Sequence, residues 1–116
     1  MMIFVFGSNL AGVHGAGAAA FALKNHGAIW GRGEGIQGSS YGIPTKDESI
    51  QTLPLLRIRG YVKRFLEYAR AHPEQDFMVT AIGCGFAGYR PQDIGPMFKG
   101  APSNCKLPQE FVPFVS

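Results

Sequence analysis

Two glycine-rich segments constrain this chain more than any other feature of its sequence. The first covers residues 6–17 (FGSNLAGVHGAG) and the second covers residues 82–89 (IGCGFAGY). Each follows a short apolar run typical of a strand, and an alanine-rich helical sequence follows the first. In α/β proteins, a glycine loop between a strand and a helix lets backbone N–H groups reach a phosphate, because a Cβ would block the approach. Together the two segments predict a single ligand held from two sides.

Length and composition predict one domain over residues 1–116. Hydrophobic residues make up 46% of the chain and charged residues 16%, which is typical of a compact protein rather than a disordered one. The first residues lack the basic region of a signal peptide, and no apolar run reaches membrane-spanning length. We therefore expect a cytoplasmic protein without a membrane partner.

The hydrophobic pattern predicts the element order β-α-β-β-α-β-α-β. Strands are expected over residues 2–6, 28–30, 39–45, 77–82 and 111–115, and helices over residues 15–26, 53–72 and 91–98. Such alternation predicts an α/β sandwich with a mixed, largely parallel sheet. Ligands of these sheets bind beyond the carboxyl ends of the strands, where both glycine loops and Lys46 are expected to lie.

The first loop offers several ligand-binding groups. The helix opens at Gly15-Ala16-Gly17, where free N–H groups and the helix dipole favour an anion, although a tight turn explains the same glycines. Ser8 and Asn9 follow Gly7 and either bind ligand or stabilise the loop, and His14 either bonds a phosphate or is merely exposed. A strict dinucleotide fingerprint is absent, because its last glycine is replaced by alanine.

The second loop predicts another phosphate cradle. Its aromatic residues either pack within the protein or form a wall for a ribose or a base, and its cysteine is expected to be a packed thiol. The candidate ligand-binding residues are Gly83, Cys84, Gly85, Phe86, Ala87, Gly88 and Tyr89.

Chemistry beyond binding depends on few residues. Lys46 and Asp47 close a strand and are the candidate catalytic pair, with Lys46 able to neutralise a diphosphate or to act as a nucleophile. A solvated turn pair is the simpler interpretation, and Glu34 is an outside candidate for a general base. The two cysteines and three histidines form no metal-ligand spacing, so we expect no metal and no cofactor.

Three segments in this order resemble a small, divergent macro domain, the ADP-ribose-binding fold. Residues 15–19 resemble the first phosphate loop of the subgroup that removes ADP-ribose from glutamate or DNA bases. Residues 43–46 resemble its strand ending in a catalytic lysine, and residues 80–85 its second glycine loop. The chain departs from that subgroup at Ala87, where an aspartate is usual, so the acidic partner of Lys46 is missing.

This resemblance implies a three-layer α/β/α sandwich that binds ADP-ribose or a related NAD-derived nucleotide, free or on a modified target. It implies hydrolysis at the ribose C1″ if there is turnover, and a compact version of this kind fits a phage or bacterial genome. A non-catalytic nucleotide sponge or sensor, another nucleotide-binding α/β fold, and a nucleic-acid-binding module remain open. The last would use the basic stretch between Arg57 and Arg70, which lacks the alternating aromatic residues usual for nucleic acid.

Overall fold

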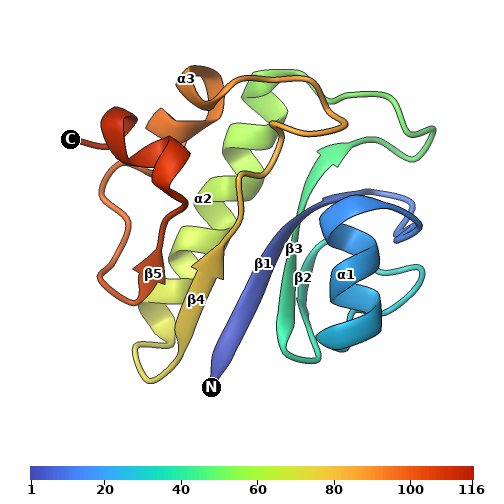
Figure 1. The fold of residues 1–116 in the computed structure, drawn as a ribbon, viewed down its shortest axis with the longest axis horizontal. Coiled ribbons are helices and arrows are strands. Elements are labelled where there is room, and N and C mark those ends of the chain that lie inside the picture. The colour runs from blue at the N-terminus through green and yellow to red at the C-terminus, as the bar shows by residue number, and fades with distance from the viewer.

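The sheet is built around its first strand. The computed structural model describes residues 1–116 and places five strands in the order β2-β3-β1-β4-β5 (Figure 1). The central strand β1 pairs in parallel with β3 and β4, and β4 pairs in parallel with β5. Only β2 is antiparallel, alongside β3. The expected α/β fold with a mixed, largely parallel sheet is therefore confirmed.

Ten elements make up the chain, and short 3-10 helices (η) close it. They are β1 (Met2–Asn9), α1 (Gly17–Asn25), β2 (Gly35–Gln37), β3 (Ser40–Lys46), α2 (Leu55–Ala71), β4 (Asp76–Val79), α3 (Pro91–Ile94), η1 (Gly95–Phe98), β5 (Cys105–Lys106) and η2 (Gln109–Phe114).

The strand order decides where a ligand can bind. The chain reaches β3 on one side of β1 through α1, and then reaches β4 on the other side of β1 through α2. Because β1, β3 and β4 are parallel, their carboxyl ends lie at one edge of the sheet. The loops that follow β1 and β4 therefore leave the sheet side by side, as at a topological switch point.

Alternation along β1 divides the core into two clusters. Ile3 and Val5 point into the larger cluster with α2, whereas Phe4 and Phe6 pack with the alanines of α1 on the opposite face. Alanine is both a strong helix former and small enough to let α1 lie close to the sheet. Helices thus cover both faces of the sheet, α2 one and α1 the other.

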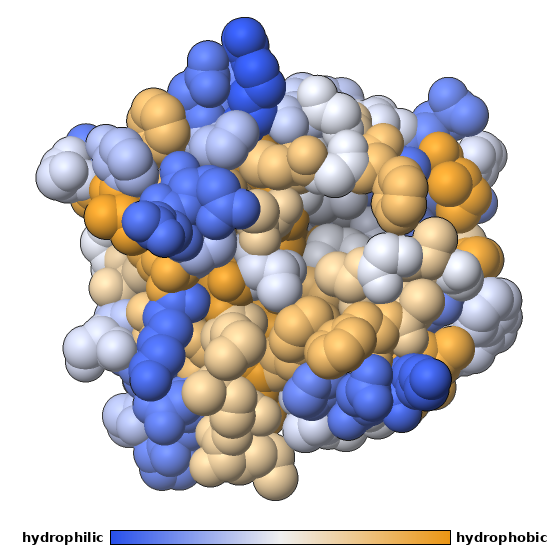
Figure 2. All heavy atoms as spheres, in the orientation of Figure 1, coloured by the Kyte–Doolittle hydropathy of each residue, from blue (hydrophilic) through white to orange (hydrophobic).

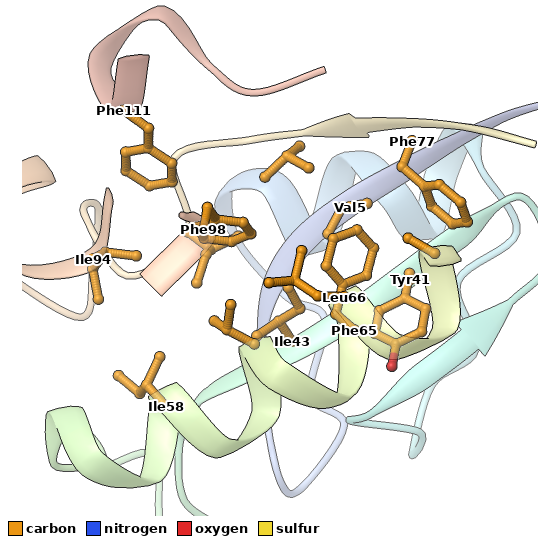
Figure 3. Packing of buried hydrophobic residues seen from close by; sticks show 14 of the residues in the cluster. Val5, Tyr41, Ile43, Ile58, Phe65, Leu66, Phe77, Ile94, Phe98 and Phe111 are labelled. Carbon is orange, nitrogen blue, oxygen red and sulfur yellow. The ribbon is translucent and has the colours of Figure 1, made fainter. Parts of the chain in front are cut away.

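The helix α2 supplies five of the sixteen buried residues of the larger cluster. Ile58, Val62, Phe65, Leu66 and Ala69 recur at helical spacing and are all buried, so the helix expected within residues 53–72 packs one apolar face on the sheet. Figure 3 shows Ile58, Phe65 and Leu66 directed at the sheet, with Phe98 and Phe111 from the last segments closing the cluster.

Two short strands lie elsewhere than the sequence predicts. Residues 28–30 form no strand, since the Ile29 N–H donates to the Gln37 side chain, and the strand next to β3 is β2 at residues 35–37. Residues 111–115 also form no strand. Phe111 is buried in η2, stacked 5.4 Å from the Phe98 ring, and the last strand is instead β5. Local donor and packing contacts override β propensity at both places.

Part of the sheet has no helix over it on the α1 side. Met2 and Met78 are directed to that side of β1 and β4 and are 38% and 44% exposed. Figure 2, in the orientation of Figure 1, shows apolar surface over this region. No helix in the structure is both long enough and apolar enough to span a membrane.

Candidate functional site

A cavity lies at the carboxyl edge of the sheet, between the two glycine loops. It measures about 510 Å³ and is bounded by the ends of β1 and β3, the first turn of α1, and the loop after β4. Figure 1 shows these segments meeting above α1, and Figure 2 shows the surface hollowed there. Volumes of this size are typical of small-molecule sites.

Most of the residues singled out in the sequence line this cavity. They are Gly7, Ser8, Asn9, Gly15, Ala16, Gly17, Lys46, Gly83, Gly85, Phe86 and Ala87. His14, Asp47, Cys84, Gly88 and Tyr89 were also predicted at the site but do not line the cavity. Tertiary contacts explain each of these exceptions, as described below.

The first turn of α1 opens onto the cavity without a cap. Ala16 occupies the N-cap position and offers no side-chain acceptor, and the first turn contains no acidic residue. The N–H groups of Gly17, Ala18 and Ala19 therefore have no partner within the protein. An uncapped helix start that lines a cavity carries positive partial charge and suits an anionic ligand.

The second loop presents the same kind of group. Gly83, Gly85, Phe86 and Ala87 line the cavity, and none of their N–H groups donates a hydrogen bond within the protein. Gly83 has φ +77°, and a Cβ there would also lie 3.0 Å from the Ile94 side chain, so this turn requires glycine. Successive free N–H groups in such a turn form a typical anion-binding concavity.

Lys46 is the one charged residue among those lining the cavity. It forms no ion pair, and its Nζ lies 5.8 Å from the centroid of the Phe86 ring. Phe86 itself is 74% exposed and lies against the start of α1, where a Cβ on Gly17 would come within 2.8 Å of the ring. The aromatic ring and the ammonium group thus bridge the two glycine loops across the mouth of the cavity.

The neutral polar side chains of the cavity are already engaged. Asn9 accepts from the Val13 N–H and donates to the Val13 carbonyl, both at 2.9 Å, and so holds the first loop. The Ser8 hydroxyl donates to the Gly33 carbonyl, and the Thr45 hydroxyl donates to the Ser8 carbonyl. These side chains therefore stabilise the loops, which was the alternative interpretation of Ser8 and Asn9.

His14 is buried beneath the loop and does not reach a ligand. It is 1% exposed, its Nε2–H donates to the Arg32 carbonyl at 2.9 Å, and its ring packs edge-on against Phe6 and Trp30. His14 therefore lies outside the lining, with its ring held towards residues 30–32 by this hydrogen bond.

Asp47 has a structural role in the turn that follows β3. Its carboxylate accepts from the N–H groups of Ser49 and Gln51 and stabilises the turn after β3. Glu34 forms an ion pair with Arg64 at 3.0 Å and does not line the cavity. Neither Asp47 nor Glu34 therefore places a carboxylate in the lining of the cavity.

The remaining exceptions lie behind the second loop. The Tyr89 hydroxyl donates to the Leu53 carbonyl at 2.7 Å, and Cys84 packs against the larger core cluster. The Gly88 N–H donates to Gly85 and closes the turn. These residues shape the loop from outside the cavity, and none of the three is part of its lining.

Several lining residues were not predicted. Most of them are neighbours in the sequence of residues that were predicted. They are Val13, Ala18, Ala19, Thr45, Ala81 and Ile82. Ile50 is different, since nothing in its sequence surroundings marks it. It enters the lining because the turn at Asp47 folds residues 47–51 over the cavity, and it is the only residue other than glycine with positive φ, at 62°.

The strain at Ile50 leads to a prediction about stability. A β-branched residue costs about 1–2 kcal/mol in this backbone region, whereas glycine adopts it readily. We expect Ile50→Gly to raise the free energy of unfolding by about 1 kcal/mol, net of the entropy that glycine adds to the unfolded chain. Urea denaturation measures the change. Ile50→Ala is the control, because it removes the side chain but keeps most of the strain, and a destabilised Ile50→Gly would contradict the expectation.

The thiol of Cys84 is predicted to be unreactive near neutral pH. Burial, reinforced by the negative charges of Glu110 and Asp93, raises its pKa to about 11. Because the thiolate is the nucleophile, alkylation by iodoacetamide should be slow at pH 8 and should accelerate as the pH rises towards 11. Mass spectrometry of the labelled residue follows the rate, and fast labelling at pH 8 in the folded protein would disagree with this environment.

The site contains no cluster of three or more His, Cys, Asp or Glu side chains that could hold a metal ion. No protein-family model, curated protein or solved structure matches this chain. Its function therefore has to be inferred from the cavity itself.

Proposed function

We propose that this protein binds ADP-ribose or a related NAD-derived nucleotide, with the diphosphate held between the two glycine loops. The observation that carries the proposal is the convergence of unpartnered N–H groups from Gly17–Ala19 and from residues 83–87 on one cavity. Lys46 adds a full positive charge, and no lining residue is acidic. A doubly charged diphosphate fits such an environment.

The fold also supports an arrangement of the macro-domain kind. Helices lie on both faces of the sheet, and the three resembling segments meet at the cavity, with residues 15–19, Lys46 and Gly83 all in its lining. We infer a three-layer α/β/α arrangement of the macro-domain kind, reduced to five strands. The remaining volume beside Phe86 is available to the ribose and the base.

The lining residues favour binding of the nucleotide without hydrolysis. Hydrolysis at the ribose C1″ needs a group to activate water or to assist the leaving group, usually a carboxylate. Ala87 stands at that position, Asp47 is held in its own turn, and Glu34 pairs with Arg64. Lys46 is then an electrostatic clamp on the diphosphate, as in a sponge or sensor.

Isothermal titration with ADP-ribose, beside NAD and AMP, tests the proposal. We expect ADP-ribose to bind with a Kd on the order of micromolar. A Cβ added at Gly85 meets no atom within 4 Å, and Gly85 is not held at positive φ, so Gly85→Val should fold normally. Its side chain should crowd the cavity and weaken binding by about 10–100-fold.

A matched control separates crowding from general damage. Gly60 in α2 also faces open space and does not line the cavity, so Gly60→Val should leave the affinity unchanged. Absence of heat and of any thermal shift with all three nucleotides would overturn the proposed function. Release of free ADP-ribose from a modified substrate, lost in Lys46→Met, would instead reinstate the hydrolase.

The nucleic-acid alternative receives less support from the same structure. Arg64 is paired with Glu34, Arg57 donates to the Tyr61 hydroxyl at 3.3 Å, and Arg70 donates to the Gly100 carbonyl. The basic stretch of α2 is therefore largely engaged with its own surroundings, as expected for the solvated face of a helix. A steep salt dependence of binding to nucleic acid would favour this alternative.

A further inference from the structure

The hydrogen-bonding groups of the cavity are strongly unbalanced. Donors are free along both loops, from Gly15 to Ala19 and at Gly83, Gly85, Phe86 and Ala87, in addition to the Lys46 ammonium. Carbonyl oxygens of the lining, in contrast, are mostly occupied by protein donors. Ten lining carbonyls accept a hydrogen bond that is not part of a regular helix or sheet. They belong to Ser8, Asn9, Val13, Ala16, Thr45, Lys46, Ala81, Gly83, Gly85 and Ala87.

The side chains repeat this imbalance. No carboxylate lines the cavity, and the Asn9 amide oxygen is occupied by the Val13 N–H. The hydroxyls of Ser8 and Thr45 are buried and bonded to neighbouring carbonyls. The cavity therefore presents more free donors than free acceptors to its ligand, since among its lining carbonyls only those of Gly15, Ile50, Ile82 and Phe86 accept no hydrogen bond within the protein.

This distribution determines which part of a nucleotide can be recognised. Phosphate oxygens are acceptors only, so a diphosphate uses every free donor. Bases are told apart by the positions of their amino and carbonyl groups, and every base offers acceptors of some kind. No exposed side-chain acceptor lines the site, so the amino group of adenine has no side-chain partner that would distinguish it from the carbonyl of guanine or uracil.

The contacts left for the base are apolar. Phe86, Val13 and Ile50 line the cavity and are 74%, 39% and 42% exposed. An exposed aromatic ring stacks on any base, because every base has a π-face. We propose that the cavity selects nucleoside diphosphates by their diphosphate, and that the base adds only apolar stacking, which does not distinguish one base from another. This inference rests on the proposed function, of which it defines the ligand class.

Displacement of bound ADP-ribose by ADP, GDP, UDP, inorganic pyrophosphate and adenosine tests the inference. ADP, GDP and UDP should displace it with dissociation constants within about thirtyfold of one another, as expected where no polar group reads the base. Pyrophosphate should compete, whereas adenosine should be at least about 100-fold weaker than ADP. A preference for ADP above about thirtyfold, or equal displacement by adenosine and ADP, would overturn the inference.

The variant Phe86→Ala separates the contribution of base stacking from that of the diphosphate. Phe86→Ala should weaken ADP, GDP and UDP by a similar factor of about ten, through loss of stacking, and should weaken pyrophosphate much less. A loss confined to ADP would mean that the base is read and would contradict the inference. If ADP-ribose itself fails to bind, thermal shifts with the same compounds show whether the cavity still binds nucleoside diphosphates. Equal shifts by ADP, GDP and UDP would retain the diphosphate site while removing ADP-ribose as its ligand, and no shifts would reject both.

Discussion

Lys46→Met is expected to weaken the binding of ADP-ribose by about 10–100-fold. Lys46 is the single cation among the lining residues, and its ammonium forms no ion pair that would compete with a ligand. A hydrogen bond to a charged group contributes about 1.5–3 kcal/mol, and each 1.4 kcal/mol corresponds to tenfold in affinity. Isothermal titration at low salt gives the comparison directly, because methionine retains the length of the side chain without its charge.

The control for Lys46→Met is Lys99→Met, which removes the same charge at an exposed position outside the cavity. This variant should bind as the unmodified protein does, which separates a local contact from the effect of net charge. Both variants should keep the free energy of unfolding within about 0.5 kcal/mol, since neither lysine is paired. Equal dissociation constants for Lys46→Met and the unmodified protein would remove Lys46 from the site.

Phe65→Ala is expected to lower the free energy of unfolding by about 3–5 kcal/mol. Phe65 is fully buried at the centre of the larger cluster, with ring centroids at 5.0 Å from Tyr41, 5.4 Å from Phe77 and 6.4 Å from Phe98 (Figure 3). Its removal leaves a cavity between α2 and the sheet and deletes three edge-on or tilted aromatic contacts. Chemical denaturation followed by circular dichroism measures the loss.

The same substitution on an exposed ring provides the comparison for Phe65. Phe86→Ala removes a side chain that is 74% exposed, so its effect on the free energy of unfolding should stay within about 0.5 kcal/mol. A similar loss in both variants would mean that the packing around Phe65 does not hold the fold together. The pair also separates the residue that stabilises the core from the residue that lies at the cavity.

Long periodic elements were predictable because their signal is local. The buried face of α2 follows from the spacing of Ile58, Val62 and Phe65, and β1 follows from an unbroken apolar run. The short strands β2 and β5 have three and two residues and carry no such pattern. They form because β3 and β4 offer unpaired backbone groups to the segment that lies beside each of them. Which segment lies there depends on the whole fold.

At the site, the positions of the two glycine loops and Lys46 after strands were readable from the residues alone, and parallel pairing brings all three to one edge of the sheet. The direction of individual side chains, in contrast, depends on contacts that form only in the folded chain. The Arg32 carbonyl draws His14 under the loop, the N–H groups of residues 49 and 51 hold Asp47 in a turn, and that turn carries Ile50 over the cavity. Each of these partners comes from the folded backbone, because a polar side chain turns to the donor or acceptor that folding leaves nearest to it.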